Sequence, residues 1–233
     1  MLSPEQIKAR AGKLTASRVA CLMKGDRDDI NGLWMELTGH PDFVPEDLSH
    51  VWPVKLGEAT ENLNLHWYEM KGTRVSRRGE VVVHPGFDWA AATLDGWDDD
   101  LECPIECKHV GGREPLEIII ERYQPQMQWQ MEICGAKQCA LSVIMGASPP
   151  IVEYIERDAD YAAEMLKRGL QFMRHVWDGT PPVVLPPVAA PIIADKTVDM
   201  ANNETWARHA SQWLQVKGAA DTAKESEKVL KSL

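Results

Sequence analysis

The chain has 233 residues, which is enough for one sizeable folded core with an appendage but not for two full domains. Hydrophobic residues make up 44% and charged residues 26%, and no apolar stretch is long and uninterrupted enough to cross a bilayer. The formal net charge of −10 argues against a broadly basic surface for nucleic acid, although it is compatible with a basic lining confined to one cleft.

The N-terminus and the cysteines favour a cytoplasmic protein. Residues 1–6 contain no basic segment followed by an apolar run, so we expect no secretion signal. The cysteines are odd in number and form no CxxC pair, which favours reduced thiols over disulfides or a zinc site. They are Cys21, Cys103, Cys107, Cys134 and Cys139.

The first quarter of the chain predicts short helices and a long loop. Ser3 caps a short helix that runs to about Ala11, with a proline at its first position. Thr15 is a candidate cap for a second short helix that ends near Met23. Residues 25–52 are rich in Asp, Pro and Gly and predict a loop with a short helix at about Leu33–Thr38.

Residues 56–70 predict an amphipathic helix, because apolar residues recur every three or four positions. The apolar positions are Leu56, Ala59, Leu63, Trp67 and Met70. A neighbouring face carries Glu58, Glu61, Leu65 and Tyr68.

Extended segments then alternate with turn residues and predict a meander of strands. The segments are Thr73–Ser76, Glu80–His84, Trp89–Leu94 and Ile105–His109, with an acidic turn at Asp98–Asp100. A helix from Pro125 to about Cys134, strands at residues 138–145 and 151–156, and a helix capped by Asp158 that runs to about Trp177 complete the pattern.

Five prolines in residues 181–191 predict a stiff connector. Residues 1–180 would then form the main domain. Residues 192–233 are predicted to form a helical C-terminal tail, because their stretch from Asn203 onward is polar and rich in alanine.

The residues most suggestive of chemistry are Asp95, Glu106 and Lys108. Residues two apart on a strand point to the same side, so Glu106 and Lys108 share a face, and a hairpin or meander can bring Asp95 beside them. Two carboxylates that hold Mg²⁺ and a lysine that serves the attacking water suit phosphodiester hydrolysis. Taken alone, the same pattern also fits an Asp-Gly turn and a solvated pair of charges on a strand.

The wider pattern resembles the PD-(D/E)XK nuclease superfamily, and within it the phage lambda exonuclease branch of viral-type recombination nucleases. Besides the three residues above, the matching segments, in chain order, are Arg10 with Thr15-Ala16-Ser17, Gly57-x-x-x-Glu61-Asn62, Arg113 and Tyr123-x-x-Gln126-Met127-Gln128. The resemblance covers residues 10–174. It implies an α/β (α+β) fold with a restriction-endonuclease-like core, in which helices flank a central mixed sheet.

The resemblance also implies roles for individual residues. Asp95 and Glu106 would be metal ligands together with the backbone carbonyl of Cys107, and Lys108 would serve the attacking water. Glu61 would support a second metal ion or its waters, and Gln126 would bond to the nucleophile or the metal shell. The implied cofactor is Mg²⁺, two ions per site, with Mn²⁺ as a substitute. Gln128 and Gln130 cannot both share the face of Gln126, because helix positions two apart diverge by about 200°.

A pocket for a 5′-terminal phosphate is implied at Arg10, Thr15, Ser17, Thr93 and Arg113. Guanidinium groups offer forked donors to phosphate, and hydroxyls and amides at a helix start add more. Each residue also has a plain structural interpretation. Thr15 would then only cap its helix, the arginines would be surface charges, and Glu61 would be a solvated helix residue.

The function that the resemblance implies is a 5′ to 3′ exonuclease on duplex DNA ends, of phage or prophage origin. A ring-shaped homotrimer and a single-strand annealing recombinase as partner belong to the same expectation. The sequence departs from the family name, because Leu94 stands where the proline is expected. The alternatives are an endonuclease of the same fold, an iron–sulfur nuclease, which the positions of the cysteines disfavour, and an inactive DNA-end or protein-binding module.

Overall fold

The computed structural model describes residues 3–191 and 203–232, and the chain divides into two units, Met1–Ile192 and Ile193–Leu233. The helices of the described residues are α1 (Pro4–Arg10), α2 (Ala16–Lys24), α3 (Arg27–Thr38), the 3-10 helix η1 (Leu48–His50), α4 (Trp52–Glu69), α5 (Leu116–Cys134), α6 (Ala159–Asp178) and α7 (Glu204–Ser232). The strands are β1 (Val75–Ser76), β2 (Val81–His84), β3 (Phe87–Thr93), β4 (Gly96–Asp98), β5 (Cys103–Val110), β6 (Gln138–Met145) and β7 (Ile151–Glu156).

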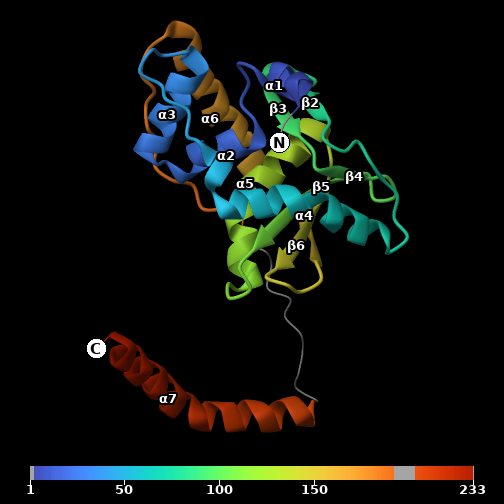
Figure 1. The fold of residues 1–233 in the computed structure, drawn as a ribbon, viewed down its shortest axis with the longest axis vertical. Helices are drawn as coiled ribbons and strands as arrows, with labels where there is room; N and C mark the ends of the chain where they lie inside the picture. Colours follow the sequence, from blue (N-terminus) through green and yellow to red (C-terminus); the bar gives the residue numbers. More distant parts are fainter. Residues whose placement is uncertain (1–2, 192–202, 233) are drawn as a thin grey trace. The chain divides into compact units, whose positions relative to one another are not determined.

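A five-stranded sheet with the order β1-β4-β5-β6-β7 forms the centre of the first unit (Figure 1). β5 and β6 run parallel, joined by α5 as the crossover that a parallel pair requires, and the other neighbours run antiparallel. β2 and β3 form a separate hairpin, so the predicted meander is divided between two sheets. The predicted fold class, an α/β core with a central mixed sheet flanked by helices, is confirmed.

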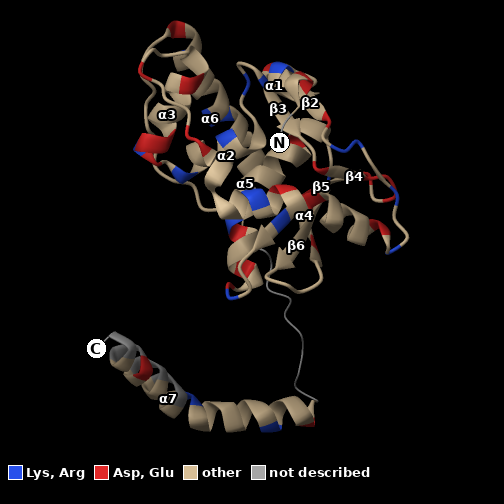
Figure 2. Cartoon of the chain, viewed as in Figure 1, with Lys and Arg blue, Asp and Glu red and all other residues tan. Residues whose placement is uncertain are grey.

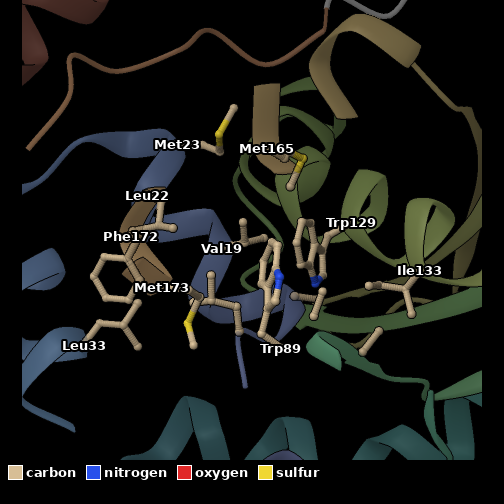
Figure 3. Close-up of a cluster of buried hydrophobic side chains, with 14 of the residues drawn as sticks. Val19, Leu22, Met23, Leu33, Trp89, Trp129, Ile133, Met165, Phe172 and Met173 are labelled. Carbon is tan, nitrogen blue, oxygen red and sulfur yellow. The ribbon is translucent and has the colours of Figure 1, made fainter. Parts of the chain in front are cut away.

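The largest hydrophobic cluster joins the helices at one end of this unit to the β2–β3 hairpin (Figure 3). α2, α3 and α6 pack against one another, and α5 packs against α2 and β3. Trp89 of β3 and Trp129 of α5 meet at the centre, with ring centroids 6.2 Å apart. The Trp129 indole N–H donates to the carbonyl of Ala91 at 2.9 Å, so the buried nitrogen keeps a partner.

The helix expected at Leu33–Thr38 begins six residues earlier, at Arg27. The prediction was wrong because it overlooked Asp26 as an N-cap. The carboxylate of Asp26 accepts the backbone N–H groups of Asp28 and Asp29 at 2.9 and 3.1 Å.

α4 docks through a different face from the apolar one expected. Its buried residues are Asn64, Leu65 and Tyr68, whereas Leu63 is 58% and Met70 66% exposed. The helix also begins at Trp52 rather than at Leu56. The regular spacing of apolar residues therefore predicted the wrong packed face. The face that packs on the sheet includes the buried polar residue Asn64.

Two further elements differ from expectation on either side of β5. α5 begins at Leu116 and contains Pro125 in its interior, although a proline usually starts or breaks a helix. Burial of Ile119 and Ile120 in its first half stabilises the turns that precede the proline. Gly96–Asp98, predicted in part as a turn, forms β4 and pairs with both β1 and β5.

Residues 181–191, the predicted connector, lie against the helices of the first unit. The Val188 N–H donates to the carbonyl of Met23 at 2.9 Å, and the Arg168 guanidinium donates to the carbonyl of Pro186 at 2.7 Å. Val184 and Val188 pack on the main hydrophobic cluster. This proline-rich segment is called the strap below.

The second unit contains the described helix α7, which falls in the stretch where a helical tail is predicted. The part of that prediction that falls on residues 192–202 lies outside the described residues. Within the described part of the chain, no helix is long and apolar enough to span a membrane.

Candidate active site

Asp95, Glu106 and Lys108 meet beside β5. Glu106 and Lys108 lie on one face of the strand, and the Lys108 ammonium forms an ion pair with the Glu106 carboxylate. Asp95 lies in the bend between β3 and β4, and its Oδ2 accepts the backbone N–H of Cys107 at 2.8 Å. The residue after Asp95 is Gly96, and a larger residue would not fit there, because a Cβ would lie 2.9 Å from Val75 Cγ1.

The charges at this site act strongly on one another. Burial and the nearby Glu106 carboxylate raise the pKa of Asp95 well above its ordinary value. Burial alone would lower the pKa of Lys108, but the carboxylates of Glu106 and Asp95 outweigh it and raise that pKa. Lys108 is therefore a cation over a wide pH range, and the two carboxylates carry a mutual repulsion that a bound cation would relieve.

Glu106 is held by two glutamines as well as by Lys108. Gln126 Nε2 donates to Oε1 and Gln130 Nε2 donates to Oε2, each at 2.5 Å. Gln126 was expected at the site, whereas Gln130 was missed. The signal was present in the spacing, because residues four apart share a helix face. Gln128 points elsewhere, to the carbonyl of Glu156 at 2.8 Å.

Glu61 lies on the face of α4 that approaches β5. Partial removal from water and the charge of Glu106 raise the pKa of its carboxyl. Its side chain is exposed and has no hydrogen bond or ion pair within the described part of the chain. It is thus electrostatically coupled to the carboxylates on the sheet while free to take a ligand.

The oxygen donors here fit a hard divalent cation, although they do not converge on one point. Among residues 3–191 and 203–232, no group of three His, Cys, Asp or Glu side chains is close enough to hold a metal ion by itself. Mg²⁺ prefers oxygen ligands and keeps several waters, so an incomplete protein set suits it. The Cys107 N–H faces Asp95, and because N–H and C=O of one strand residue face the same edge, its carbonyl lies on the Asp95 side too.

Tyr123 is a further neighbour that the sequence did not assign to the site. The Lys108 ammonium lies 4.7 Å from the centroid of its ring, within the range of a cation–π contact. Figure 2 shows acidic and basic positions together where α4, α5 and β5 meet, so the site combines both charges despite the acidic net charge.

Three of the five residues expected to bind a 5′-phosphate lie together. The Arg10 guanidinium donates to Thr15 Oγ1 at 3.3 Å, and the hydroxyls of Thr15 and Ser17 are 3.5 Å apart. Thr15 stands at the N-cap position of α2, but its side chain makes no capping hydrogen bond. Burial and the nearby charge of Arg18 lower the pKa of Arg10, which shows that its cation is poorly compensated.

Thr93 and Arg113 are placed apart from this contact network. Thr93 Oγ1 is buried without a hydrogen-bond partner, which is uncommon for a hydroxyl in a folded protein. Leu14 bonds through its backbone to Trp89 and Ala91, so the segment before α2 lies beside the strand that ends in Thr93. Arg113 lies exposed in the turn after β5, with no side-chain partner in the described residues.

The comparison with family models places this arrangement in a known group. The model of the YqaJ-like viral recombinase domain matches residues 6–137, which include every residue that we expected at the site. The chain belongs to this family. The YqaJ-like match agrees with the predicted relationship to the lambda exonuclease branch, which is thereby confirmed. No curated protein matches the chain.

The same fold is found in solved structures of an alkaline exonuclease and of a phage-related exonuclease. The alkaline exonuclease LHK-Exo from Laribacter hongkongensis is 24% identical, with a TM-score of 0.62 over 76% of this chain and 94% of that chain. LHK-Exo in complex with dAMP gives 25% identity and a TM-score of 0.61, with the same coverage of 76% and 94%. A phage-related exonuclease from Haemophilus somnus 129PT is 12% identical, with a TM-score of 0.51 over 70% of this chain and 93% of that chain.

Proposed function

We propose that this YqaJ-like domain is a Mg²⁺-dependent exonuclease that degrades one strand of linear duplex DNA from its 5′ end and leaves 3′ single-stranded tails. The observation that carries the proposal is the meeting of Asp95, Glu106 and Lys108 beside β5. Membership of a viral recombinase family and a fold shared with an alkaline exonuclease support a nuclease.

The proposed chemistry assigns one task to each side chain. Asp95, Glu106 and the Cys107 carbonyl would hold Mg²⁺, with Glu61 supporting a second ion or its waters. When bound, Mg²⁺ polarises the scissile phosphate and lowers the pKa of a bound water. Lys108, kept charged by the carboxylates, orients the attacking water or neutralises charge that develops on the phosphate. Gln126 and Gln130 keep the Glu106 carboxylate in place.

The 5′ polarity rests on the group formed by Arg10, Thr15 and Ser17. An undercompensated guanidinium beside two hydroxyls suits a terminal phosphate, which offers more charge than an internal phosphodiester. Thr93 Oγ1, buried without a partner, is a candidate fourth contact, and Arg113 is proposed as a fifth from its exposed turn.

Assembly and partners extend the same proposal. A ring-shaped homotrimer would keep the enzyme on its DNA, and a single-strand annealing recombinase would take over the 3′ tails. The viral recombinase family supports a phage or prophage origin and a role in recombination in the bacterial cytoplasm.

The test is digestion of linear duplexes that carry a phosphate on one chosen 5′ end, with closed circles as the control. Wild type and Lys108→Ala are compared in Mg²⁺ and in chelator. We expect only linear DNA to shorten, from the phosphorylated end, in Mg²⁺ and with the wild type alone. Cutting of circles would identify an endonuclease, and a wild type that cuts nothing would identify a binding module.

A second variant tests the phosphate pocket separately. Arg113→Ala should abolish the preference for 5′-phosphorylated ends while metal binding stays unchanged. An unchanged preference would remove Arg113 from the pocket.

A further inference from the structure

The position of Glu61 depends on what fixes α4 to the sheet. Asp95 and Glu106 lie in or next to strands, whereas Glu61 is carried by a helix. Hydrophobic packing is non-directional. Contacts of Leu65 and similar side chains therefore keep α4 on the sheet, but they oppose small rotations or shifts of the helix only weakly. A carboxylate that must act together with groups on β5 needs a more specific restraint.

Asn64 provides such a restraint three residues after Glu61. Its side chain is 1% exposed and faces Ser142 of β6, which is fully buried. Asn64 Nδ2 donates to the Ser142 carbonyl at 2.9 Å, and Ser142 Oγ donates to Asn64 Oδ1 at 2.6 Å. Asn64 Nδ2 also lies 3.5 Å from the carbonyl oxygen of Lys108. The Asn64 amide therefore links α4 to β5, which carries Glu106 and Lys108, and to the neighbouring strand β6.

Thr60 forms a second tie, one turn before Asn64 on the same helix face. Its Oγ1 is 3.1 Å from His109 Nδ1, and His109 Nε2 is 2.9 Å from the carbonyl of Gly146. Polar contacts at residues 60 and 64 thus bracket Glu61 and connect α4 to β5 and to the end of β6.

We propose that the buried Asn64–Ser142 pair positions Glu61 by fixing the rotation and axial shift of α4 against β5 and β6. The inference rests on the proposed function. A satisfied buried polar network specifies one geometry, whereas an apolar interface of the same shape tolerates several. Asn64 does not reach the reacting atoms, so its effect passes through Glu61 and it is a positioning residue.

The experiment uses the full chain with the double substitution Asn64→Leu and Ser142→Ala. Replacing both partners by apolar groups leaves no buried polar side chain unpaired, so we expect an unfolding temperature close to that of the wild type. Mn²⁺ binding in the absence of DNA, followed by electron paramagnetic resonance, should weaken by about 10- to 100-fold, and kcat on linear duplex should fall by a similar factor.

Tyr68→Phe is the matched control. Tyr68 also belongs to the buried face of α4, and its hydroxyl donates to Asp98 Oδ2 of β4 at 2.7 Å and lies 3.3 Å from the Tyr154 hydroxyl of β7, so it bonds to neither β5 nor β6. Its loss should lower the unfolding temperature and leave Mn²⁺ binding and kcat unchanged. Thr60→Val, which keeps the side-chain shape, should weaken Mn²⁺ binding in the same direction as the double substitution and serves if that variant does not fold.

The inference is overturned if the folded double variant, or Thr60→Val in its place, binds Mn²⁺ and cleaves DNA as the wild type does. Equal losses in Tyr68→Phe would also overturn it, because any loosening of α4 would then have the same effect. A wild type that cleaves no DNA overturns the proposed function instead, and this outcome is seen before any variant is compared.

Discussion

Glu106 has three polar side chains as partners, and they come from two elements. Lys108 lies on the same strand, and Gln126 and Gln130 lie one turn apart on α5. Gln130 is completely buried and also receives the Cys139 thiol at 3.8 Å on its Oε1. The Glu106 carboxylate, which would bind metal, is thus oriented by hydrogen bonds from α5.

Gln130→Met should therefore impair cleavage more than its cost in stability explains. Losing a donor to a buried carboxylate costs about 1.5–3 kcal/mol in the free energy of unfolding. We expect the rate per folded molecule to fall by about 10- to 100-fold, because Glu106 is no longer oriented. Gln128→Met is the control, since Gln128 is equally buried but bonds away from the site. Thermal unfolding and single-turnover cleavage are measured for both variants. If Gln130→Met and Gln128→Met cleave at equal rates per folded molecule, Gln130 does not orient Glu106.

Asp95→Asn should stabilise the metal-free protein while abolishing cleavage. Burial and Glu106 raise the pKa of Asp95, which means that the charged carboxylate destabilises the folded state. The asparagine amide carries no charge and removes this cost. The amide oxygen can still accept the Cys107 N–H. Without metal we expect a higher unfolding temperature, by about 2–4 °C for each kcal/mol gained.

Adding Mg²⁺ should reverse the order of the two proteins. A ligand that binds only the folded state raises the unfolding temperature, and the wild type keeps the carboxylate that binds it. A wild type whose unfolding temperature does not respond to Mg²⁺ would contradict a metal site at Asp95.

At the scale of elements, the strap leaves no space for a side chain at Gly25. Gly25 ends α2 with φ of +69°, and a Cβ there would lie 2.6 Å from the carbonyl oxygen of Leu185. Gly39 ends α3 with φ of +64° and open space around it. Both glycines occupy the left-handed conformation, but only Gly25 is covered by the strap.

Gly25→Ala should consequently destabilise the protein more than Gly39→Ala. The left-handed conformation costs alanine about 1 kcal/mol at either position. At Gly25 the clash with Leu185 adds to this cost, because the strap must move away from α2. Denaturant unfolding of both variants measures the difference. Equal losses would mean that the strap does not press on α2.

The sequence predicted most strands and the start of several helices, because alternation and capping residues are local signals. It failed where tertiary contacts decide. A proline favours the first turn of a helix, so Pro125 was predicted to begin one, yet α5 starts at Leu116, where Ile119 and Ile120 are buried. The packed face of α4 was misjudged because its buried polar residue, Asn64, has partners only in the folded sheet.

The candidate site was similarly predictable in part. Asp95, Glu106 and Lys108 follow from their spacing and from the family pattern. Gln130 and Tyr123 take part through contacts made only after α5 has crossed over the sheet.

At the scale of the whole molecule, the hydrophobic clusters of the described residues all lie within the first unit. In the second unit, described by itself, α7 carries the exposed apolar side chains of Trp206, Trp213 and Leu214. The core that supports the site is therefore contained in Met1–Ile192.

A chain that ends at residue 192 should fold and unfold at the same temperature as the full chain. We expect its intrinsic cleavage of linear duplex to persist, because the proposed site residues all precede the strap. Circular dichroism and end-digestion assays check both points, and sedimentation of the two forms shows whether the tail serves assembly. A clear drop in unfolding temperature would show that residues 193–233 complete the fold.

The mixed pairing of β5 also bears on how fast the site is built. The β4–β5 pairing joins residues close in the chain, such as Gly96 and Ile105, whereas the parallel β5–β6 pairing must wait until α5 has closed a long loop. Asp95 can thus come beside β5 early, but the glutamines of α5 and Ser142 of β6 arrive with the slow crossover. The candidate site should therefore mature in two steps on the nascent chain, and its contacts with α5 and β6 should form only after β6 has been synthesised.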